Sequence, residues 1–302
     1  MKIYSLLDEF FIDEPLSICL GFFDGVHLGH LSLLNKAKTS NKSVGVIMFD
    51  DNASSIFNKG NELITPFSMR LEYLKQAGID YVFYLPIDSK TRKISKDSFI
   101  DYYLKRLNID SIYVGDDFHF GYQARGSIDD LKKVYGNRVH VLEMINKDGK
   151  KISSSFIKSL IKEGKVNKAH ELLGHYYRMQ GKVVYGFQNG IKIGFPTANV
   201  MLNGNYVIPK FGVYAGIVQL NDSIHLAMVN VGVHPTIDKL DTPLVEIHII
   251  NYNGDIYNQD IVLELLDFIR DEKTFKNIND LKKQLESDKE KIIKNYKNYL
   301  IS

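Results

Sequence analysis

The sequence contains one cysteine, Cys19, and no tryptophan among its 302 residues. A single cysteine excludes an intramolecular disulfide, so a reducing, intracellular setting fits best. No apolar run approaches the roughly 20 residues that a membrane-spanning helix needs. Asp8, Glu9, Asp13 and Glu14 make the start of the chain acidic, unlike a secretory signal. We therefore expect a cytoplasmic protein.

An excess of one charge sign is also missing. Lys and Arg total 38, Asp and Glu total 36, and the formal net charge is +2, with the two signs mixed along the chain. A nucleic-acid or membrane partner would favour a basic patch, so we expect neither. The length suggests two domains, which we place at residues 1–174 and 175–302. We expect small-molecule substrates and a monomer or weak homo-oligomer.

Short apolar runs alternate with amphipathic stretches through the first 174 residues. The predicted strands are Ser17–Leu20, Val44–Phe49, Tyr81–Leu85, Ser111–Val114 and Val139–Glu143. The stretches with helical spacing are Met69–Ala77, Ser98–Leu107 and Asp129–Tyr135. This alternation predicts an α/β domain with a doubly wound parallel sheet, whose ligand binds at the carboxyl ends of the strands.

Residues 21–30, Gly-Phe-Phe-Asp-Gly-Val-His-Leu-Gly-His, are the clearest chemical signature. An apolar run precedes them and a helical pattern follows, so a strand leads through a glycine turn into a helix. The unpaired N–H groups of that helix N-terminus favour phosphate. His27 and His30, three residues apart, can face one pocket and donate hydrogen bonds to phosphate oxygens. The simpler alternative is a pair of surface histidines beside a tight turn.

Two further loops follow predicted strands. Residues 114–121 combine glycines with Asp116 and Asp117, which suits either a loop over a polar ligand or an acidic turn. Residues 151–158 carry three consecutive serines before a helix. Their hydroxyls either cap that helix or bind phosphate, and capping is the simpler interpretation when this loop is taken alone.

Strands and turns replace the helices in the second half. Asn189-Gly190 predicts a hairpin joining residues 182–187 to 191–195. The further predicted strands are Gly212–Leu220, Ile224–Val231, Leu244–Ile250 and Ile261–Ile269. This pattern predicts an all-β, antiparallel barrel, followed by a charged helix from Asp280.

Two features of the predicted barrel carry chemistry. In Gly194-Phe-Pro-Thr-Ala-Asn199, Thr197 and Asn199 alternate onto one side, and their oxygens are hard ligands that suit Mg²⁺ on ATP phosphates. A turn whose polar groups bond to backbone is the alternative. Glu246 and His248 face the opposite side of their strand from Val245 and Ile247. Glu246 is either a solvated carboxylate or a base that deprotonates an attacking hydroxyl.

These stretches together resemble the bacterial bifunctional riboflavin kinase/FAD synthetase family. In the first half, the His-x-Gly-His core and the two loops after it follow the order of the FMN adenylyltransferase module. In the second half, Gly194-Phe-Pro-Thr-Ala-Asn199, Asn230-Val-Gly-Val-His-Pro-Thr236 and Phe268-Ile-Arg-Asp-Glu272 are similar to the riboflavin kinase motifs. The resemblance implies a Rossmann-like nucleotidylyltransferase domain and a riboflavin kinase barrel with a terminal helix.

The resemblance also implies chemistry and residue roles. Riboflavin would be phosphorylated by ATP to FMN, and FMN would be adenylylated to FAD with release of pyrophosphate, with Mg²⁺ as the cofactor. Glu246 would be the kinase base, and His27 and His30 would act in adenylyl transfer. The implied ATP and phosphate contacts are Gly21, Phe23, Asp24, Gly25, Gly29, Ser154, Ser155, Lys158, Gly194, Pro196, Thr197 and Asn199, the last two as metal ligands. The implied flavin contacts are Asp117, Phe211, Gly212, Val213, Tyr214 and Arg270.

The first half departs from the family pattern in three places. Asp51-Asn52-Ala53 stands where a Pro-His-Pro loop is usual, and Ser155 and Lys158 stand where threonine and arginine are usual. His119 replaces a residue that is often arginine. Lysine keeps the charge of arginine but loses its planar fork. Two alternatives therefore stay open: a riboflavin kinase with a weakened or lost adenylyltransferase activity, and a non-catalytic flavin-binding regulator.

Overall fold

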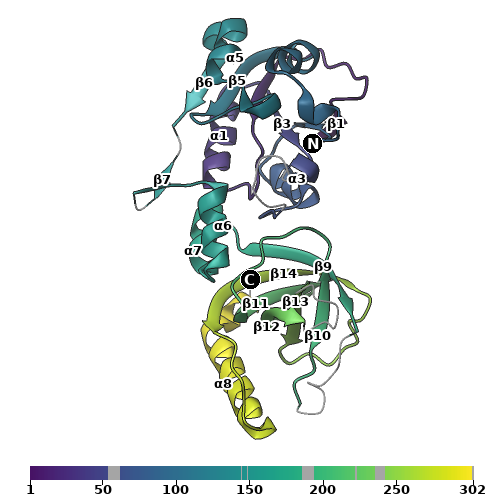
Figure 1. Ribbon diagram of the computed structural model, residues 1–302, viewed down its shortest axis with the longest axis vertical. Coiled ribbons are helices and arrows are strands. Elements are labelled where there is room, and N and C mark those ends of the chain that lie inside the picture. The colour runs from purple at the N-terminus through teal and green to yellow at the C-terminus, as the bar shows by residue number, and fades with distance from the viewer. Residues whose placement is uncertain are drawn as a thin grey trace. The chain divides into compact units, whose positions relative to one another are not determined.

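The computed structural model describes residues 1–53, 62–143, 145–147, 149–185, 194–221, 223–234 and 242–300. The chain divides into two compact units, Met1–Phe156 and Ile157–Ser302 (Figure 1). The sequence-based boundary at residue 174 lies after helices α6 (Ser154–Lys162) and α7 (Val166–Leu173). The division by compactness falls inside α6, because α7 packs against strands of the second unit.

Unit 1 is built on a six-stranded parallel sheet with the order β1-β4-β3-β2-β5-β6. Its strands are β1 (Lys2–Ser5), β2 (Leu16–Leu20), β3 (Ser43–Phe49), β4 (Tyr81–Leu85), β5 (Ile109–Gly115) and β6 (Val139–Leu142). The five strands predicted in this half are confirmed, and the edge strand β1 was not predicted. A two-stranded ribbon, β7 (Asn146–Lys147) with β8 (Lys150–Lys151), follows the sheet.

Helices cover both faces of this sheet. They are α1 (Leu28–Lys38), α3 (Phe67–Gln76), α4 (Lys96–Phe99), the π-helical turn Ile100–Leu104 and α5 (Ile128–Tyr135). One core cluster contains Val82 of β4 with Leu34 of α1 and Leu74 of α3. The other contains Phe83 of β4 with Leu131 of α5. Successive strand residues enter opposite clusters, as the two-residue period of a strand requires, so the doubly wound prediction is confirmed.

The strand order places the predicted loops together. β2 pairs with β3 on one side and with β5 on the other, so the chain order reverses between β2 and β5. Ligands of such sheets bind outside the carboxyl ends of the strands at this reversal. Residues 21–30 follow β2 and residues 116–121 follow β5. Topology therefore brings both loops to the expected crevice.

Unit 2 contains a closed barrel with the order β10-β13-β12-β11-β14-β9. Its strands are β9 (Tyr177–Val184), β10 (Ala198–Leu202), β11 (Gly212–Leu220), β12 (Ser223–His234), β13 (Thr242–Ile249) and β14 (Asp260–Arg270). All neighbours are antiparallel, which confirms the barrel. The predicted hairpin at 182–195 lies largely outside the described residues.

Helix α8 (Ile278–Tyr296) packs against the outside of this barrel (Figure 1). Ile292 is fully buried among apolar strand residues, with Leu285 and Ile293 partly buried beside it. A buried ion pair fixes the same face, since Arg270 Nε donates to Asp288 Oδ2 at 2.8 Å. The expected terminal helix is confirmed, beginning at Ile278 with Asn277 as its N-cap.

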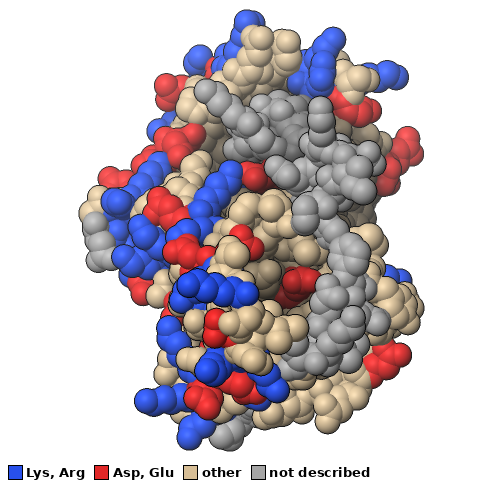
Figure 2. All heavy atoms as spheres, turned by 60° about the horizontal axis from the view of Figure 1, so that its bottom comes forward, with Lys and Arg blue, Asp and Glu red and all other residues tan. Residues whose placement is uncertain are grey.

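The surface carries both charge signs. On the face drawn in Figure 2, Lys and Arg side chains lie among Asp and Glu side chains, with uncharged surface between them. Within the part of the chain that the structure describes, no helix is long and apolar enough to cross a membrane.

Candidate functional site

The turn after β2 has an unusual backbone. Phe23, Gly25 and Val26 have φ angles of 57°, 86° and 38°. A left-handed conformation costs a side-chain-bearing residue roughly 1–2 kcal/mol, and a β-branched residue such as Val26 rarely adopts it. Gly21 is needed for another reason, because a Cβ there would lie 3.0 Å from the Phe23 ring. Strain of this kind persists only where surrounding contacts hold it.

Those contacts come from two distant segments. Asp24 Oδ1 accepts hydrogen bonds from the backbone N–H groups of Ile64 at 2.8 Å and Thr65 at 3.0 Å. Gly25 N–H donates to Thr65 Oγ1 at 2.7 Å. From α6, the Ser154 hydroxyl donates to the Asp24 carbonyl at 2.9 Å. Asp24 therefore holds the turn in place, and Ser154 joins the predicted serine loop to it.

His27 and His30 lie together at the start of α1. Their rings stack with centroids 3.7 Å apart and an interplanar angle of 16°. His27 is the N-cap, and its Nδ1 accepts from the His30 backbone N–H at 3.3 Å. Because Nδ1 accepts, a neutral His27 carries its proton on Nε2, which makes Nε2 a donor.

The environment of His30 keeps its ring neutral. Burial holds the pKa of His30 well below its usual value, and the nearby His27 and Arg70 lower it further. Its Nδ1 is buried and has no hydrogen-bond partner among the described residues. The first turn of α1 contains no acidic residue, so the partial positive charge of the helix N-terminus is not offset there. This arrangement suits a bound anion.

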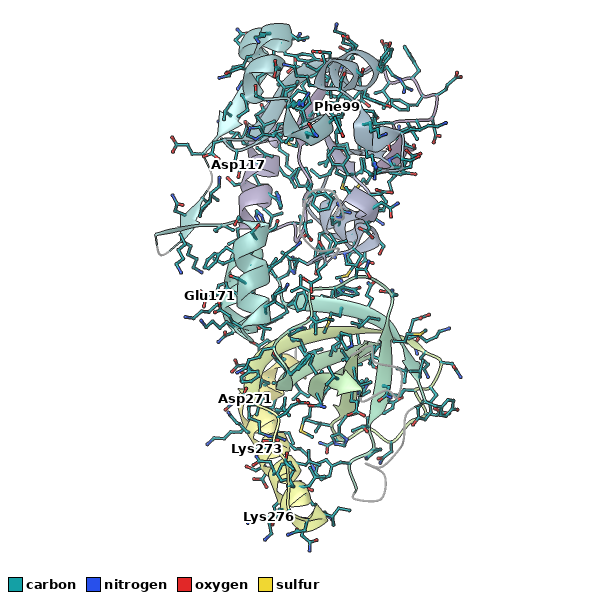
Figure 3. All side chains as sticks on the ribbon, in the orientation of Figure 1. Phe99, Asp117, Glu171, Asp271, Lys273 and Lys276 are labelled. Carbon is teal, nitrogen blue, oxygen red and sulfur yellow. The ribbon has the colours of Figure 1, made fainter. Side chains whose placement is uncertain are left out.

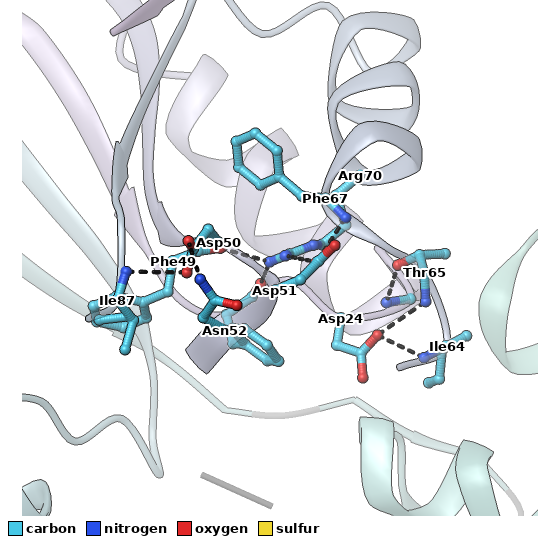
Figure 4. Close-up of polar contacts among 12 residues, drawn as sticks. Asp24, Phe49, Asp50, Asp51, Asn52, Ile64, Thr65, Phe67, Arg70 and Ile87 are labelled. Atoms are coloured by element: carbon cyan, nitrogen blue, oxygen red, sulfur yellow. Dashed lines mark hydrogen bonds and ion pairs between the residues drawn. The ribbon is translucent and has the colours of Figure 1, made fainter. Parts of the chain in front are cut away.

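A buried arginine next to the turn was missed from the sequence. Arg70 of α3 is 0% exposed, and its Nη1 donates to the carbonyls of Phe22 at 2.8 Å and Phe49 at 2.9 Å. Its Nη2 binds Asp51 Oδ1 at 2.8 Å (Figure 4). The helical spacing placed Arg70 on a helix, but no sequence signal showed that it would turn inward.

The same network holds residues 50–53, which follow β3. Asp51 Oδ1 also accepts from the Phe67 backbone N–H at 2.7 Å, at the start of α3. Asp50 Oδ1 accepts from the Ile87 backbone N–H at 3.1 Å, beyond β4 (Figure 4). Burial raises the pKa of Asp50 above its usual value. The two carboxylates therefore tie the ends of β3 and β4 and the start of α3 together.

A cavity of about 530 Å³ lies beside this loop. Among the described residues its walls are mainly aliphatic and aromatic, and Arg92 is the one charged side chain. They come from the ends of β3 and β4, from α4 and the segment before it, and from the loop after β5. The lining residues are Phe49, Leu85, Ile87, Thr91, Arg92, Ile94, Phe99, Gly121, Tyr122, Gln123 and Ala124. A space of this size and lining suits a flat aromatic ligand with polar edges.

Asp117 lies in the loop after β5 (Figure 3). Its Oδ2 is 2.9 Å from Lys151 Nζ, and Asp116 Oδ1 is 3.0 Å from the same nitrogen. Lys151 belongs to the predicted serine segment, so the structure joins the two predicted loops through an exposed ion pair. Ser155 and Lys158 lie within α6, and Ser153 caps that helix through the Phe156 backbone N–H at 3.3 Å.

In the barrel, strand register aligns polar residues that are distant in sequence. Glu246 of β13 lies directly opposite Asn199 of β10 and Asn230 of β12. Directly opposed residues have Cβ atoms about 4.5–5.5 Å apart, so Asn199 and Asn230 flank Glu246. All three are half-buried, while Val200 and Val245, their strand neighbours, are buried. We call Asn199, Glu246 and Asn230 the polar row.

The loop before the polar row is anchored by His248. Its Nδ1 lies 2.9 Å from the Pro196 carbonyl, so Nδ1 carries the proton and donates. Burial lowers the pKa of His248, which keeps the ring neutral. Phe195 packs against His248 with ring centroids 5.1 Å apart. These contacts hold the segment that carries Thr197, which is half-buried and lies two residues before Asn199.

The predicted flavin contacts of the barrel differ in environment. Phe211 is 40% exposed, whereas Tyr214 is 0% exposed and its hydroxyl donates to the Lys210 carbonyl. Gly212 has φ 149°, and a Cβ there would lie 2.5 Å from the Arg270 carbonyl. Val213 pairs with Arg270 in the β11–β14 ladder, and the Arg270 guanidinium binds Asp288. The Arg270 Nε therefore helps to hold α8 against the barrel.

Besides Arg70, sequence reasoning missed two neighbours of the barrel residues. His248 was placed beside Glu246 by strand alternation, but its bond to Pro196 depends on tertiary packing. Asn230 was noticed within a motif and given no role. Glu272 lies close to Gly232, two residues after Asn230, since its Oε1 would be 2.5 Å from a Cβ on that glycine. The register makes Asn230 adjacent to Glu246, whereas the contacts of His248 with Pro196 and of Glu272 with Gly232 depend on tertiary packing.

Comparisons with known proteins agree with the two units. The FAD synthetase family model matches residues 11–156, and the riboflavin kinase family model matches residues 173–296. The chain is 33% identical to the bifunctional riboflavin kinase/FMN adenylyltransferase of Bacillus subtilis over 93% of this chain and 92% of that protein. It is 32% identical to the protein of the same name from Escherichia coli over 91% of each chain.

A solved structure is similar over nearly the whole chain. The crystal structure of a Streptococcus pneumoniae protein named a macrolide-efflux protein has a TM-score of 0.87 and 29% identity, covering 98% of this chain and 99% of that one. The family models, the two relatives and this structural likeness all span both units. The chain belongs to the bifunctional riboflavin kinase/FMN adenylyltransferase family.

Proposed function

We propose that this chain converts riboflavin to FAD in two ATP-dependent steps, the first in the barrel and the second in the parallel-sheet unit. The observation that carries the proposal is the polar row, which sets a half-buried carboxylate between two amides, with Thr197 two residues before one of them. A non-catalytic flavin binder would not need a base beside hard oxygen ligands. Membership of the family supports both activities.

In the kinase step, Glu246 accepts the proton of the terminal ribityl hydroxyl of riboflavin. The hydroxyl oxygen forms a bond to the γ-phosphorus of ATP as the bond to the β–γ bridging oxygen breaks, giving FMN and ADP. The Thr197 hydroxyl and the Asn199 amide oxygen fit Mg²⁺, which prefers hard oxygen ligands. When bound, Mg²⁺ offsets negative charge on the phosphates. Gly194 and Pro196 shape the loop, and Phe211–Tyr214 and Arg270 form the flavin side.

In the adenylyl-transfer step, a phosphate oxygen of FMN forms a bond to the α-phosphorus of ATP, and pyrophosphate leaves. His27 donates from Nε2, and the N-terminus of α1 adds its N–H groups, so charge on the phosphates is stabilised without a covalent intermediate. His30 stacks on His27 and holds it in place. We assign Ser154, Ser155 and Lys158 to the triphosphate and Asp117 to substrate positioning.

The 530 Å³ cavity is the best place in unit 1 for the isoalloxazine ring of FMN. Its apolar walls match the faces of the ring, and Arg92 and Gln123 offer donors for polar edges. Phe49 lines this cavity, and its backbone carbonyl accepts a hydrogen bond from Arg70 Nη1. The same nitrogen also donates to the Phe22 carbonyl in the turn. The cavity and the phosphate turn are therefore neighbours.

One observation favours a second candidate, a riboflavin kinase that no longer makes FAD. Asp50 and Asp51 place two carboxylates in the loop after β3, and carboxylates near a phosphate site oppose anion binding. Arg70 neutralises one of them. Purified protein incubated with FMN, ATP and Mg²⁺ separates the candidates. FAD and pyrophosphate above the level of a His27→Ala/His30→Ala control support two steps, whereas FMN formation alone supports the kinase.

We also assign the adenylyltransferase to residues 1–174 and the kinase to residues 175–302. We place the protein in the cytoplasm, as a monomer or weak homo-oligomer that acts on small molecules and binds neither nucleic acid nor membranes. Size-exclusion chromatography with light scattering tests the oligomeric state.

A further inference from the structure

Arg70 connects two parts of the candidate site in unit 1, the turn after β2 and the cavity. One wall is the strained turn after β2, which Arg70 contacts through the Phe22 carbonyl, immediately before the first left-handed residue. The other is the cavity, which Arg70 contacts through the carbonyl of Phe49. One nitrogen, Nη1, donates to both carbonyls, so it fixes the separation of the turn from the cavity wall.

The other terminal nitrogen of the guanidinium, Nη2, extends this connection. Nη2 binds Asp51, which also accepts from the first N–H of α3, the helix that carries Arg70. Asp50, the neighbour of Asp51, accepts from Ile87, a further wall of the cavity. Side-chain rotation is blocked as well, because the guanidinium lies 4.8 Å from the centroid of the Phe22 ring and 5.5 Å from that of Phe67.

We infer that Arg70 is a positioning residue for adenylyl transfer: its planar fork sets the phosphate-binding turn at a fixed distance and angle from the flavin cavity. The inference rests on the proposed adenylyl transfer in unit 1. Arg70 itself is fully buried against protein groups and needs no contact with substrate.

Geometry explains why this role affects turnover more than affinity. In-line attack requires the FMN phosphate and the α-phosphorus of ATP to meet at about 3–3.5 Å, and a misplacement of about 1 Å can cost on the order of 100-fold in rate. Each substrate contacts its own wall, so each can still bind when the two walls shift. Loss of the connection should therefore lower kcat while leaving both KM values nearly unchanged.

The chain offers a matched control in Arg106. It also lies in unit 1, donates to two backbone carbonyls, Leu6 at 2.8 Å and Asp8 at 2.6 Å, and stacks on a ring, that of Phe10, at 4.6 Å. These partners follow the edge strand β1, away from the reversal between β2 and β5. Arg106 is exposed whereas Arg70 is buried, so Arg106→Gln controls for the loss of arginine–carbonyl hydrogen bonds and an arginine–ring contact without touching the turn or the cavity.

The test measures FAD formation from FMN and ATP, and FMN formation from riboflavin, in the full-length wild type and in Arg70→Gln, Arg70→Lys and Arg106→Gln. We expect Arg70→Gln to lower kcat for FAD formation about 100-fold, with KM for ATP and FMN within about threefold of wild type. Arg70→Lys, whose ammonium can reach a carbonyl but cannot form the fork, should recover part of the loss. Arg106→Gln and all FMN formation rates should stay within about threefold of wild type.

Three results would overturn the inference. The first is a kcat for Arg70→Gln equal to that of Arg106→Gln. The second is a loss confined to one KM, which would mean ordinary binding. The third is a wild type that makes FMN but no FAD, which would remove the proposed adenylyl transfer itself. If Arg70→Gln does not fold, Arg70→Lys decides: a kcat reduced severalfold with both KM values kept supports the fork, and a wild-type kcat refutes it.

Discussion

The two units assemble their sites in different ways. In the barrel, Asn199, Glu246 and Asn230 sit on neighbouring strands, and the hydrogen-bonded register alone makes them adjacent. In the parallel sheet, His27 follows a turn with left-handed residues, and its position depends on Asp24, Thr65, Ser154 and Arg70 holding that turn.

The difference separates two kinds of sensitivity. A site built on register is rigid wherever the ladder is intact, so single substitutions should act through the chemistry of the side chain removed. A site built on a clamped turn can lose activity when a remote clamp is removed, although its chemical groups remain. Single substitutions in each site test this distinction.

Removing the barrel base should have the largest effect. Glu246→Gln keeps the shape of the side chain but cannot accept the ribityl proton, and we expect FMN formation to fall about 1,000-fold. FAD formation from supplied FMN should be unchanged. Steady-state assays of both steps measure this, with Glu264→Gln on β14 as the matched strand control. Turnover by Glu246→Gln near that of the control would contradict the assigned role.

The histidine at the turn should come next. His27→Ala removes the Nε2 donor and the cap of α1, so we expect FAD formation to fall about 100-fold while FMN formation is retained. His140→Ala on β6, whose ring stacks on Tyr113 at 4.8 Å, provides a matched control. If both variants make FAD equally well, the phosphate site lies elsewhere.

Replacing Asn230, which flanks Glu246 in the polar row, should have a smaller effect. Asn230 has no direct part in proton transfer, and we expect Asn230→Leu to lower kcat for FMN formation about tenfold by removing a polar neighbour of Glu246. Gln219→Leu, on the exposed part of β11, is the control. A kcat for Asn230→Leu equal to that of the control would show that register adjacency alone does not make a residue functional.

The smallest effect concerns pH, and both units should show it. The pKa values of His30 and His248 are lowered by burial, so the unfolded chain binds more protons than the folded chain as the pH falls below about 6.5. The free energy of unfolding is therefore unaffected by these two histidines above that pH, and it falls progressively towards pH 5 as the unfolded chain takes up protons. Urea unfolding at pH 7.5 and 5.5 measures it, and His30→Gln or His248→Gln should reduce the pH dependence. If neither variant changes how the free energy of unfolding depends on pH, groups other than these two histidines cause that dependence.

Much of the fold could be predicted because its signals are local. β4 and β11 begin and end at the predicted residues, since each is a compact apolar run bounded by turn residues. The helix after the glycine turn followed from the spacing of Leu31, Leu33 and Leu34. The edge strand β1 was missed because half of its residues are exposed, so its apolar pattern is weak.

The sites were less accessible to sequence reasoning for a physical reason. Register is a relation between strands, so nothing in the residues around Glu246 identifies Asn230 as its neighbour. The inward direction of Arg70 depends on carbonyls 48 and 21 positions away in sequence. The left-handed conformation of Val26 could not be expected from a valine. The sequence showed individual motif residues, but it did not show the contacts that hold those residues in place.

Cys19 offers a way to observe one unit alone. The thiol lies on β2, just before the turn at residues 21–26, and is 0% exposed. Burial raises its pKa, so it is unreactive while the sheet is closed. Unit 2 has no cysteine. The rate at which a thiol reagent labels the native chain therefore reports how often the parallel sheet opens, whatever the barrel does. Saturating ATP should slow that labelling if it closes the turn, which makes the chain's sole sulfhydryl a built-in reporter of nucleotide binding.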